Sequence, residues 1–176
     1  MKRYFAACIL FIAISCTNTD KKVGENAADS TAKNLNTNTI ELKDSKVQNI
    51  YNDYISLKDA LVATKPAEVQ KTATELKASL ADYKGCENTA VLANKIATAT
   101  DIALQRKEFL SLSSDVIALF QHADLKKGVI YVQHCPMANK GNGGDWLAAE
   151  QKIQNPYYGD QMMECGSVVQ EIKVTK

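Results

Sequence analysis

The spacing of large apolar residues over positions 44–63 predicts an amphipathic helix. Apolar side chains recur there three and four positions apart, while polar residues occupy the positions between them. This spacing places the apolar side chains on one face of a helix. The apolar series is Val47, Ile50, Tyr51, Tyr54, Ile55, Leu57 and Leu61, most of which share that face.

The following sequence predicts three more helices, packed against the first. Pro66 fits the first turn of a second helix over 66–84, and Gly85 fits its C-terminal cap. Residues 88–122 contain neither Gly nor Pro, and Asp101 offers an N-cap that divides this run into two helices. Because the connections are short, neighbouring helices are expected to be antiparallel.

Two runs of β-branched residues near the C-terminus predict strands. One runs from Val129 to Val132 and the other from Val168 to Val174, with a long excursion between them. Loops of that length are more often functional than simple connections. The predicted fold is therefore mainly α, an antiparallel helical bundle with a small C-terminal β hairpin and a long loop.

The N-terminal sequence indicates export. Lys2 and Arg3 precede an apolar run that is too short to span a membrane, and Ala13, Ile14 and Ser15 lead to Cys16 in the manner of a bacterial lipobox. We expect a signal peptide at 1–15, a lipidated Cys16 in a periplasmic, membrane-anchored lipoprotein, a polar disordered tether over 16–41 and a folded part over 42–176. An ordinary cleaved signal that happens to end near a cysteine is the alternative.

The charge balance argues against nucleic-acid binding. The chain has 21 Lys and Arg against 20 Asp and Glu, and loss of Lys2 and Arg3 with the leader leaves a small acidic excess. Contact with a membrane is expected through the lipid only. The acidic residues of the helices alternate with lysines, as on solvated faces, so no catalytic group is expected and the chain is not predicted to be an enzyme.

Sulfur-containing residues are concentrated in one segment near the C-terminus. Apart from Cys16, the expected mature chain has six of them, and five lie within residues 134–165. The sixth is Cys86, which we expect to be a buried or idle thiol. The five are Cys135, Met137, Met162, Met163 and Cys165.

The spacing of these residues predicts a soft-metal site. Cys135 and Met137 can point to one side of an extended segment, and Met162 and Cys165 can share one face of a helical turn. Thiolate and thioether ligands together select Cu(I), with His134 or Met163 as a further ligand and with Trp146 and Tyr157 lining the site. The structural alternative is a Cys135–Cys165 disulfide with the methionines as core filler.

The same segment resembles a known family. The motifs HCPMA, GGDWL and NPYYGDQMMECG are similar to those of the bacterial domain-of-unknown-function family 3347, whose members are exported proteins and also occur fused to CusB-type heavy-metal efflux adaptors. This resemblance implies a role in copper or related metal handling and efflux components as partners. The matching positions are Cys135, Pro136, Met137, Trp146, Asn155, Pro156, Tyr157, Gly159, Met162, Cys165 and Gly166.

Two functions therefore remain open from the sequence. The first is a periplasmic lipoprotein that binds Cu(I) or a similar soft ion at Cys135, Met137, Met162 and Cys165 and serves as a buffer or chaperone in metal homeostasis or efflux. The second is a protein-interaction module that binds no metal and is held rigid by a Cys135–Cys165 disulfide. The redox state of the two thiols separates these hypotheses.

Overall fold

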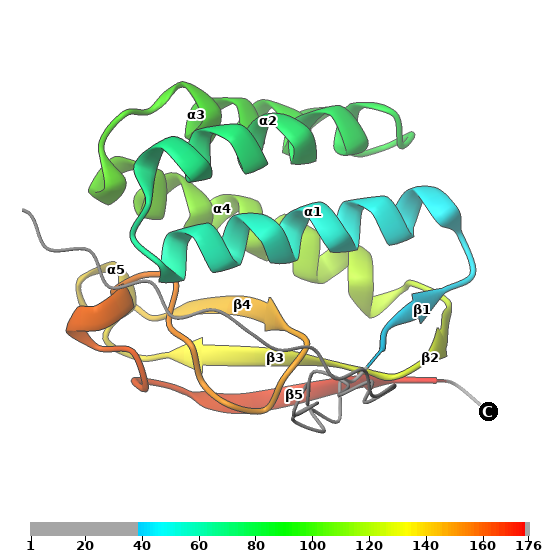
Figure 1. The fold of residues 1–176 in the computed structure, drawn as a ribbon. Helices are drawn as coiled ribbons and strands as arrows, with labels where there is room; N and C mark the ends of the chain where they lie inside the picture. The colour runs from blue at the N-terminus through cyan, green and yellow to red at the C-terminus, as the bar shows by residue number, and fades with distance from the viewer. Residues whose placement is uncertain (1–38, 175–176) are drawn as a thin grey trace, which may run out of the picture. The chain divides into compact units, whose positions relative to one another are not determined.

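The computed structural model describes residues 39–174, which form four packed helices followed by small antiparallel sheets (Figure 1). The predicted fold class, mainly helical with C-terminal strands, is confirmed. The predicted signal peptide, Cys16 and most of the predicted tether lie outside the described residues. The helices are α1 (Ser45–Val62), α2 (Pro66–Ala81), α3 (Glu87–Thr98) and α4 (Ile102–Gln121).

The helix boundaries follow local capping, with one departure from the prediction. Asp44 caps α1, and Asp101 caps α4 by accepting the Leu104 N–H at 3.0 Å, which confirms the predicted break before α4. The second helix ends at Ala81 and not at residue 84. Gly85, with φ of 95°, lies in the connection to α3, so it turns the chain there and does not cap α2 as predicted.

The helices and the main sheet lie in layers (Figure 1). Helices α2 and α3 pack on each other in the outer layer, and α1 and α4 lie between them and the sheet. Apolar side chains from both helical layers and from the sheet form one continuous core. The four-helix part therefore serves as a platform for the C-terminal strands.

The predicted hairpin is part of a three-stranded antiparallel sheet. Strand β3 (Val129–Cys135) lies in the middle, between β4 (Gly144–Ala148) and β5 (Ser167–Lys173). The predicted strands correspond to β3 and β5, but β4 lies inside the segment expected to be a long loop. A second small sheet pairs β1 (Glu41–Leu42) with β2 (Leu125–Lys127). The segment that precedes the four helices in the sequence is thus joined to the segment that follows them.

The connection from β4 to β5, residues 149–166, begins over the Gln133 side of the central strand and then runs against α4 at Pro156 and Tyr157. Gln133 in β3 is fully buried, and its Nε2 donates to the carbonyl oxygens of Glu150 (2.8 Å), Gln151 (3.3 Å) and Lys152 (3.3 Å). Alternate residues of a strand face opposite sides, so Cys135 lies on the same covered face as Gln133. The connection is thus held against the central strand, with a 3-10 turn, η1 (Gly159–Gln161), near its end.

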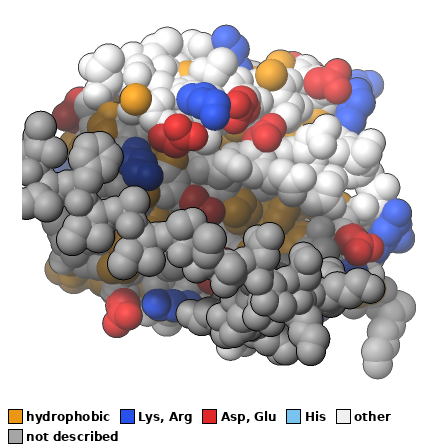
Figure 2. Space-filling model, viewed as in Figure 1, with side chains coloured by type: hydrophobic (Ala, Val, Ile, Leu, Met, Phe, Trp, Pro, Cys, Tyr) orange, Lys and Arg blue, Asp and Glu red, His pale blue; other side chains and the backbone are white. Residues whose placement is uncertain are grey.

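Charged side chains of both signs are interspersed on the face of the molecule seen in Figure 2. This distribution fits the near balance of acidic and basic residues in the sequence. Within residues 39–174, each helix is either too short or too polar to cross a membrane.

Candidate functional site

Cys135 and Cys165, which are far apart in the sequence, are brought into contact on the covered face of the sheet. Their Sγ atoms lie 3.0 Å apart. Cys135 ends the central strand β3 and is fully buried, while Cys165 is the second-last residue of the connection before β5 and is half-buried. Solvent therefore reaches this thiol pair from the Cys165 side.

A glycine allows the two segments to approach this closely. Gly166 has φ of +146°, and a Cβ atom at this position would lie 2.7 Å from the carbonyl oxygen of His134 and 3.0 Å from the Trp146 ring. Real Cβ atoms do not come so close to a backbone oxygen, so only glycine fits beside β3 here. The residue after Cys165 therefore permits the contact between the cysteines.

Asn155 fixes the backbone of Cys165. This side chain is fully buried; its Nδ2 donates to the Cys165 carbonyl oxygen at 2.9 Å, and its Oδ1 accepts the Tyr157 N–H at 2.8 Å. The Asn155 N–H donates to the carbonyl oxygen of Met163 at 2.9 Å. A single amide residue thus ties together both ends of the turn that carries Cys165.

The contact between the two thiols changes how readily they lose a proton. The pKa of Cys165 is raised, first by its hydrogen bond with Cys135, then by burial and by the charge of a Cys135 thiolate. The backbone N–H of Met137, which donates to the Cys165 sulfur, opposes this and lowers the pKa. Ionisation of one thiol therefore disfavours ionisation of the other, and a bound cation would relieve that repulsion.

The methionines lie around the pair, but not in the predicted conformation. The chain turns at Pro136, so Met137 has helical backbone angles (φ −83°, ψ −15°), and the predicted extended Cys135–Met137 segment is wrong. The Met137 side chain is 52% exposed. The Cys165 N–H donates to the Met162 carbonyl oxygen at 3.0 Å, which closes the predicted turn between these residues, and both Met162 and Met163 are half-buried.

His134 is not brought to the cysteines. Its Nδ1 lies 2.7 Å from Oδ1 of Asp145 across the β3–β4 pair, and alternation along the strand places its side chain on the opposite face from Cys135. Trp146 is fully buried beneath Gly166 and packs edge-on against Tyr157, with ring centroids 5.9 Å apart. These two aromatic residues support the site from the core side.

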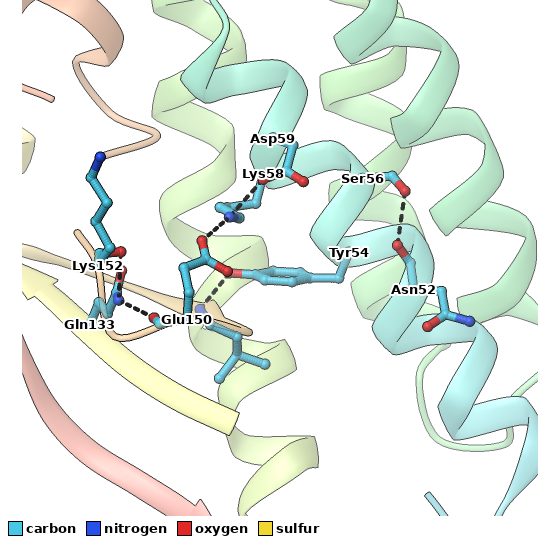
Figure 3. A network of polar contacts seen from close by, with 9 residues as sticks. Asn52, Tyr54, Ser56, Lys58, Asp59, Gln133, Glu150 and Lys152 are labelled. Atoms are coloured by element: carbon cyan, nitrogen blue, oxygen red, sulfur yellow. Dashed lines mark hydrogen bonds and ion pairs between the residues drawn. The ribbon is translucent and has the colours of Figure 1, made fainter. Parts of the chain in front are cut away.

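A polar network that the sequence did not reveal links this covered face to the helices (Figure 3). The ammonium group of Lys58 in α1 is buried and lies 3.1 Å from Oε1 of Glu150 and 2.6 Å from Oδ1 of Asp59. The Tyr54 hydroxyl accepts the Leu147 N–H at 3.1 Å. Burial raises the pKa of Tyr54 far above its ordinary range, so the hydroxyl stays neutral. No sequence motif marks Lys58 or Glu150, because their pairing depends on the path of the connection.

The two thiols are donors that a soft cation with few ligands could use. Two metal–sulfur bonds of about 2.3 Å put the sulfur atoms about 3.8 Å apart at a tetrahedral angle, and farther apart in a site with two or three ligands, whereas a disulfide puts them about 2.05 Å apart. The observed 3.0 Å separation lies between these values. Within residues 39–174, no three His, Cys, Asp or Glu side chains converge as a metal site, so a third side-chain ligand from this part of the chain would be a thioether.

Comparison with known proteins identifies the helical part. The model of a family described as "Protein of unknown function (DUF3347)" matches residues 50–128, which run from α1 through β2. The match ends before β3 and so leaves out both paired cysteines. No curated protein and no solved structure matches the chain. The family indicated by the sequence motifs is confirmed, but the match covers the helical bundle and does not include those motifs. Residues 50–128 are a DUF3347 domain.

Proposed function

We propose that this protein binds a soft metal ion, Cu(I), through the thiolates of Cys135 and Cys165, and that it stores or transfers the ion and does not catalyse a reaction. The observation that carries the proposal is the 3.0 Å contact between two thiols from distant segments, one of them reachable from solvent. Two thiolates suffice for a soft monovalent ion. Because one side of the pair is open, an ion could be exchanged with another carrier.

The backbones of two methionines contact Cys165, and their thioethers would complete the proposed ligand set. The Met137 N–H contacts the Cys165 sulfur, so the exposed Met137 side chain starts beside the pair. Met162 lies one turn before Cys165. Thioether sulfur favours Cu(I) over Zn²⁺, whose structural sites use Cys and His. Met163 remains a further candidate, while His134 would have to leave Asp145 and change faces to take part.

The proposed setting is the periplasm, with the chain held at a membrane by a lipid on Cys16. The polar sequence between Cys16 and the fold would let the domain reach components of a heavy-metal efflux system, the proposed partners. The leader sequence and the family resemblance support this setting. Thiols in such an oxidising compartment would need protection, and a bound Cu(I) ion would provide it.

A second function is favoured by the same short contact. Sulfur atoms 3.0 Å apart need only a small side-chain movement to form a disulfide, which would lock residues 149–166 to β3. The chain would then be a rigid interaction module that binds no metal. Its contact surface would be the connection itself, which the helices hold through Lys58 and Glu150.

An anaerobic Cu(I) titration of the full chain against a competing chelator tests the proposal. We expect one tightly bound ion per chain and protection of two thiols from alkylation. The Cys135→Ser, Cys165→Ser double variant should lose this binding, whereas Cys86→Ser, which removes a separate buried thiol, should keep it. Equal affinity in the double variant would overturn the proposal. Thiols that are already oxidised in the protein as isolated, and no Cu(I) binding after reduction, would favour the disulfide module.

The methionine ligands need a separate measurement. Met137→Leu and Met162→Leu keep the size and apolar character of each side chain but remove the sulfur atom. We expect each change to weaken Cu(I) binding by about tenfold, as loss of one weak ligand should. If neither variant changes the affinity, the thiolates bind the ion without these thioethers.

A further inference from the structure

A cavity of about 520 Å³ lies where the N-terminal half of α4 meets the turn after β3 and the region of η1. Its size falls within the usual range for pockets that hold small organic ligands. Its apolar lining includes Ile102 and Leu110 of α4 and the rings of Tyr157 and Tyr158. The proposed metal site does not use this cavity.

The charged lining of the cavity is cationic. Lys107 and Lys140 both line it and are exposed, and neither makes an ion pair or a side-chain hydrogen bond with any residue in 39–174. Lys140 and its neighbour Asn139 have left-handed backbone angles, with φ of 58° and 50°. Such conformations are costly for residues other than glycine and are often kept where a side chain serves a site.

A third cationic side chain in the cavity wall, Arg106, already donates hydrogen bonds to other residues of the protein. Arg106 donates through Nε to the Pro156 carbonyl oxygen at 3.0 Å and through Nη2 to Leu61 O at 3.1 Å and Thr64 Oγ1 at 2.9 Å. Burial lowers the pKa of Arg106, and the nearby carboxylate of Asp160 raises it. Arg106 therefore has a structural role in the cavity wall, whereas the ammonium groups of Lys107 and Lys140 can bind a ligand.

We propose that this cavity binds a small amphipathic organic anion, an aromatic carboxylate, at a site separate from the thiol pair. The carboxylate would lie between Lys107 and Lys140, neither of which forms an ion pair with any residue in 39–174. The flat apolar body would pack against Leu110, Ile102 and the ring of Tyr158. A neutral ligand of the same shape would leave both lysines without an anionic partner in the cavity.

The test is calorimetric titration of the full chain with 2-naphthoate, with the neutral analogue 2-naphthalenemethanol as the comparison ligand. We expect saturable binding of one naphthoate and much weaker binding of the alcohol. In the Lys107→Gln, Lys140→Gln variant, the naphthoate affinity should fall by about tenfold, as expected for loss of two partly exposed charge contacts. Lys95→Gln, Lys126→Gln is the matched control, because it removes two exposed lysines outside the cavity.

A second variant tests the location without changing any charge. Ala103 is an exposed residue of α4 that lines the cavity, so Ala103→Trp should fill the space and block both ligands while leaving the fold intact. The proposal would be overturned if the wild type showed no saturable naphthoate binding. It would also be overturned if the Ala103→Trp variant or the double-lysine variant bound naphthoate with the affinity of the wild type. Equal affinity for the acid and the alcohol would overturn the assignment of an anion. Cu(I) binding should be unchanged in these variants, so this inference and the proposed metal site can fail independently.

Discussion

The hydroxyl of Tyr54 in the middle of α1 accepts the backbone N–H of Leu147 in β4 at 3.1 Å and contacts the Ser113 hydroxyl in α4 at 2.6 Å. Tyr54 is completely buried. One phenol thus joins two helices of the DUF3347 domain to the sheet that carries the thiol pair. Strand β4 is at the edge of the sheet, so some of its backbone N–H and C=O groups have no partner strand. The Tyr54 hydroxyl provides a hydrogen-bond partner for one of these groups, the Leu147 N–H.

Tyr54→Phe should therefore destabilise the protein by about 1–3 kcal/mol, because it leaves the buried Leu147 N–H and the Ser113 hydroxyl without this partner. Urea unfolding followed by circular dichroism measures the change. Tyr83→Phe is the control, since the Tyr83 hydroxyl has no hydrogen bond to a residue within 39–174. A Tyr54→Phe effect as small as that of the control would show that the contact adds nothing to stability.

Gly166→Ala should cost more stability than Gly141→Ala, although both glycines have positive φ, +146° and +89°. A Cβ at Gly141 meets nothing within 4 Å, so that substitution carries only the backbone cost of about 1–2 kcal/mol. A Cβ at Gly166 also meets the His134 carbonyl oxygen at 2.7 Å and pushes Cys165 away from Cys135. Thermal unfolding and the rate of disulfide formation under mild oxidation measure both consequences. If the Cys135–Cys165 disulfide formed at the wild-type rate in Gly166→Ala, Gly166 would not be needed to bring the two cysteines together.

The affinity for Cu(I) should rise with pH, because the ion must displace thiol protons and contact with Cys135 raises the pKa of Cys165. Up to about tenfold per pH unit is expected for each proton displaced. Chelator competition between pH 6 and pH 9 gives the slope. A flat profile would mean that the ion does not replace a proton on this pair.

The same raised pKa predicts how the reduced, metal-free protein responds to alkali. A thiol whose pKa is higher in the folded state stabilises the fold fully below its unfolded pKa of about 8.5, and this contribution is lost as the pH rises through the folded pKa. The stability of the wild type relative to Cys165→Ser should therefore fall above about pH 8.5. A constant difference up to pH 10 would contradict the raised pKa.

Removing Glu150 should destabilise the protein more than removing Lys58. The Lys58 ammonium is 1% exposed, whereas the side chains of Glu150 and Asp59 are 39% and 57% exposed. Glu150→Ala leaves a buried cation with one remaining partner, at a cost of about 1–3 kcal/mol, while Lys58→Met leaves carboxylates that water can solvate. Urea unfolding of both single variants and the double variant compares the costs. The reverse order would mean that the lysine stem, and not its charge, holds the connection.

The helical part could be predicted closely from the sequence, while the candidate site could be predicted only in part. Helix periodicity, Asp101 and the proline at position 66 are local signals, and local contacts dominate a bundle. Strand β4 was missed because GDWLA follows a Gly-rich turn and has no β-branched residue. The α-helix-like turn at Met137 was missed because Pro136 also fits an extended segment.

The closeness of Cys135 and Cys165 could be guessed from composition, but its cause could not. It depends on Asn155, Gly166 and the carbonyls held by Gln133, which act through the path of an irregular connection. His134 was a candidate ligand because it adjoins Cys135, yet adjacency along a strand separates side chains onto opposite faces. The cavity at α4 has no sequence signature, because its walls come from three separate segments.

The position of Cys165 after all four helices in the sequence has a consequence for the order in which the molecule is built. During synthesis the residues of α1–α4 emerge first, and their contacts are local enough to form early. A nascent chain that still lacks residues 165–176 holds Cys135 but has neither its partner thiol nor strand β5. Within residues 39–174, the thiol pair can therefore form only after the residues of all four helices have been made, and premature pairing of Cys135 with Cys86 would have to compete with burial of Cys86 in the bundle.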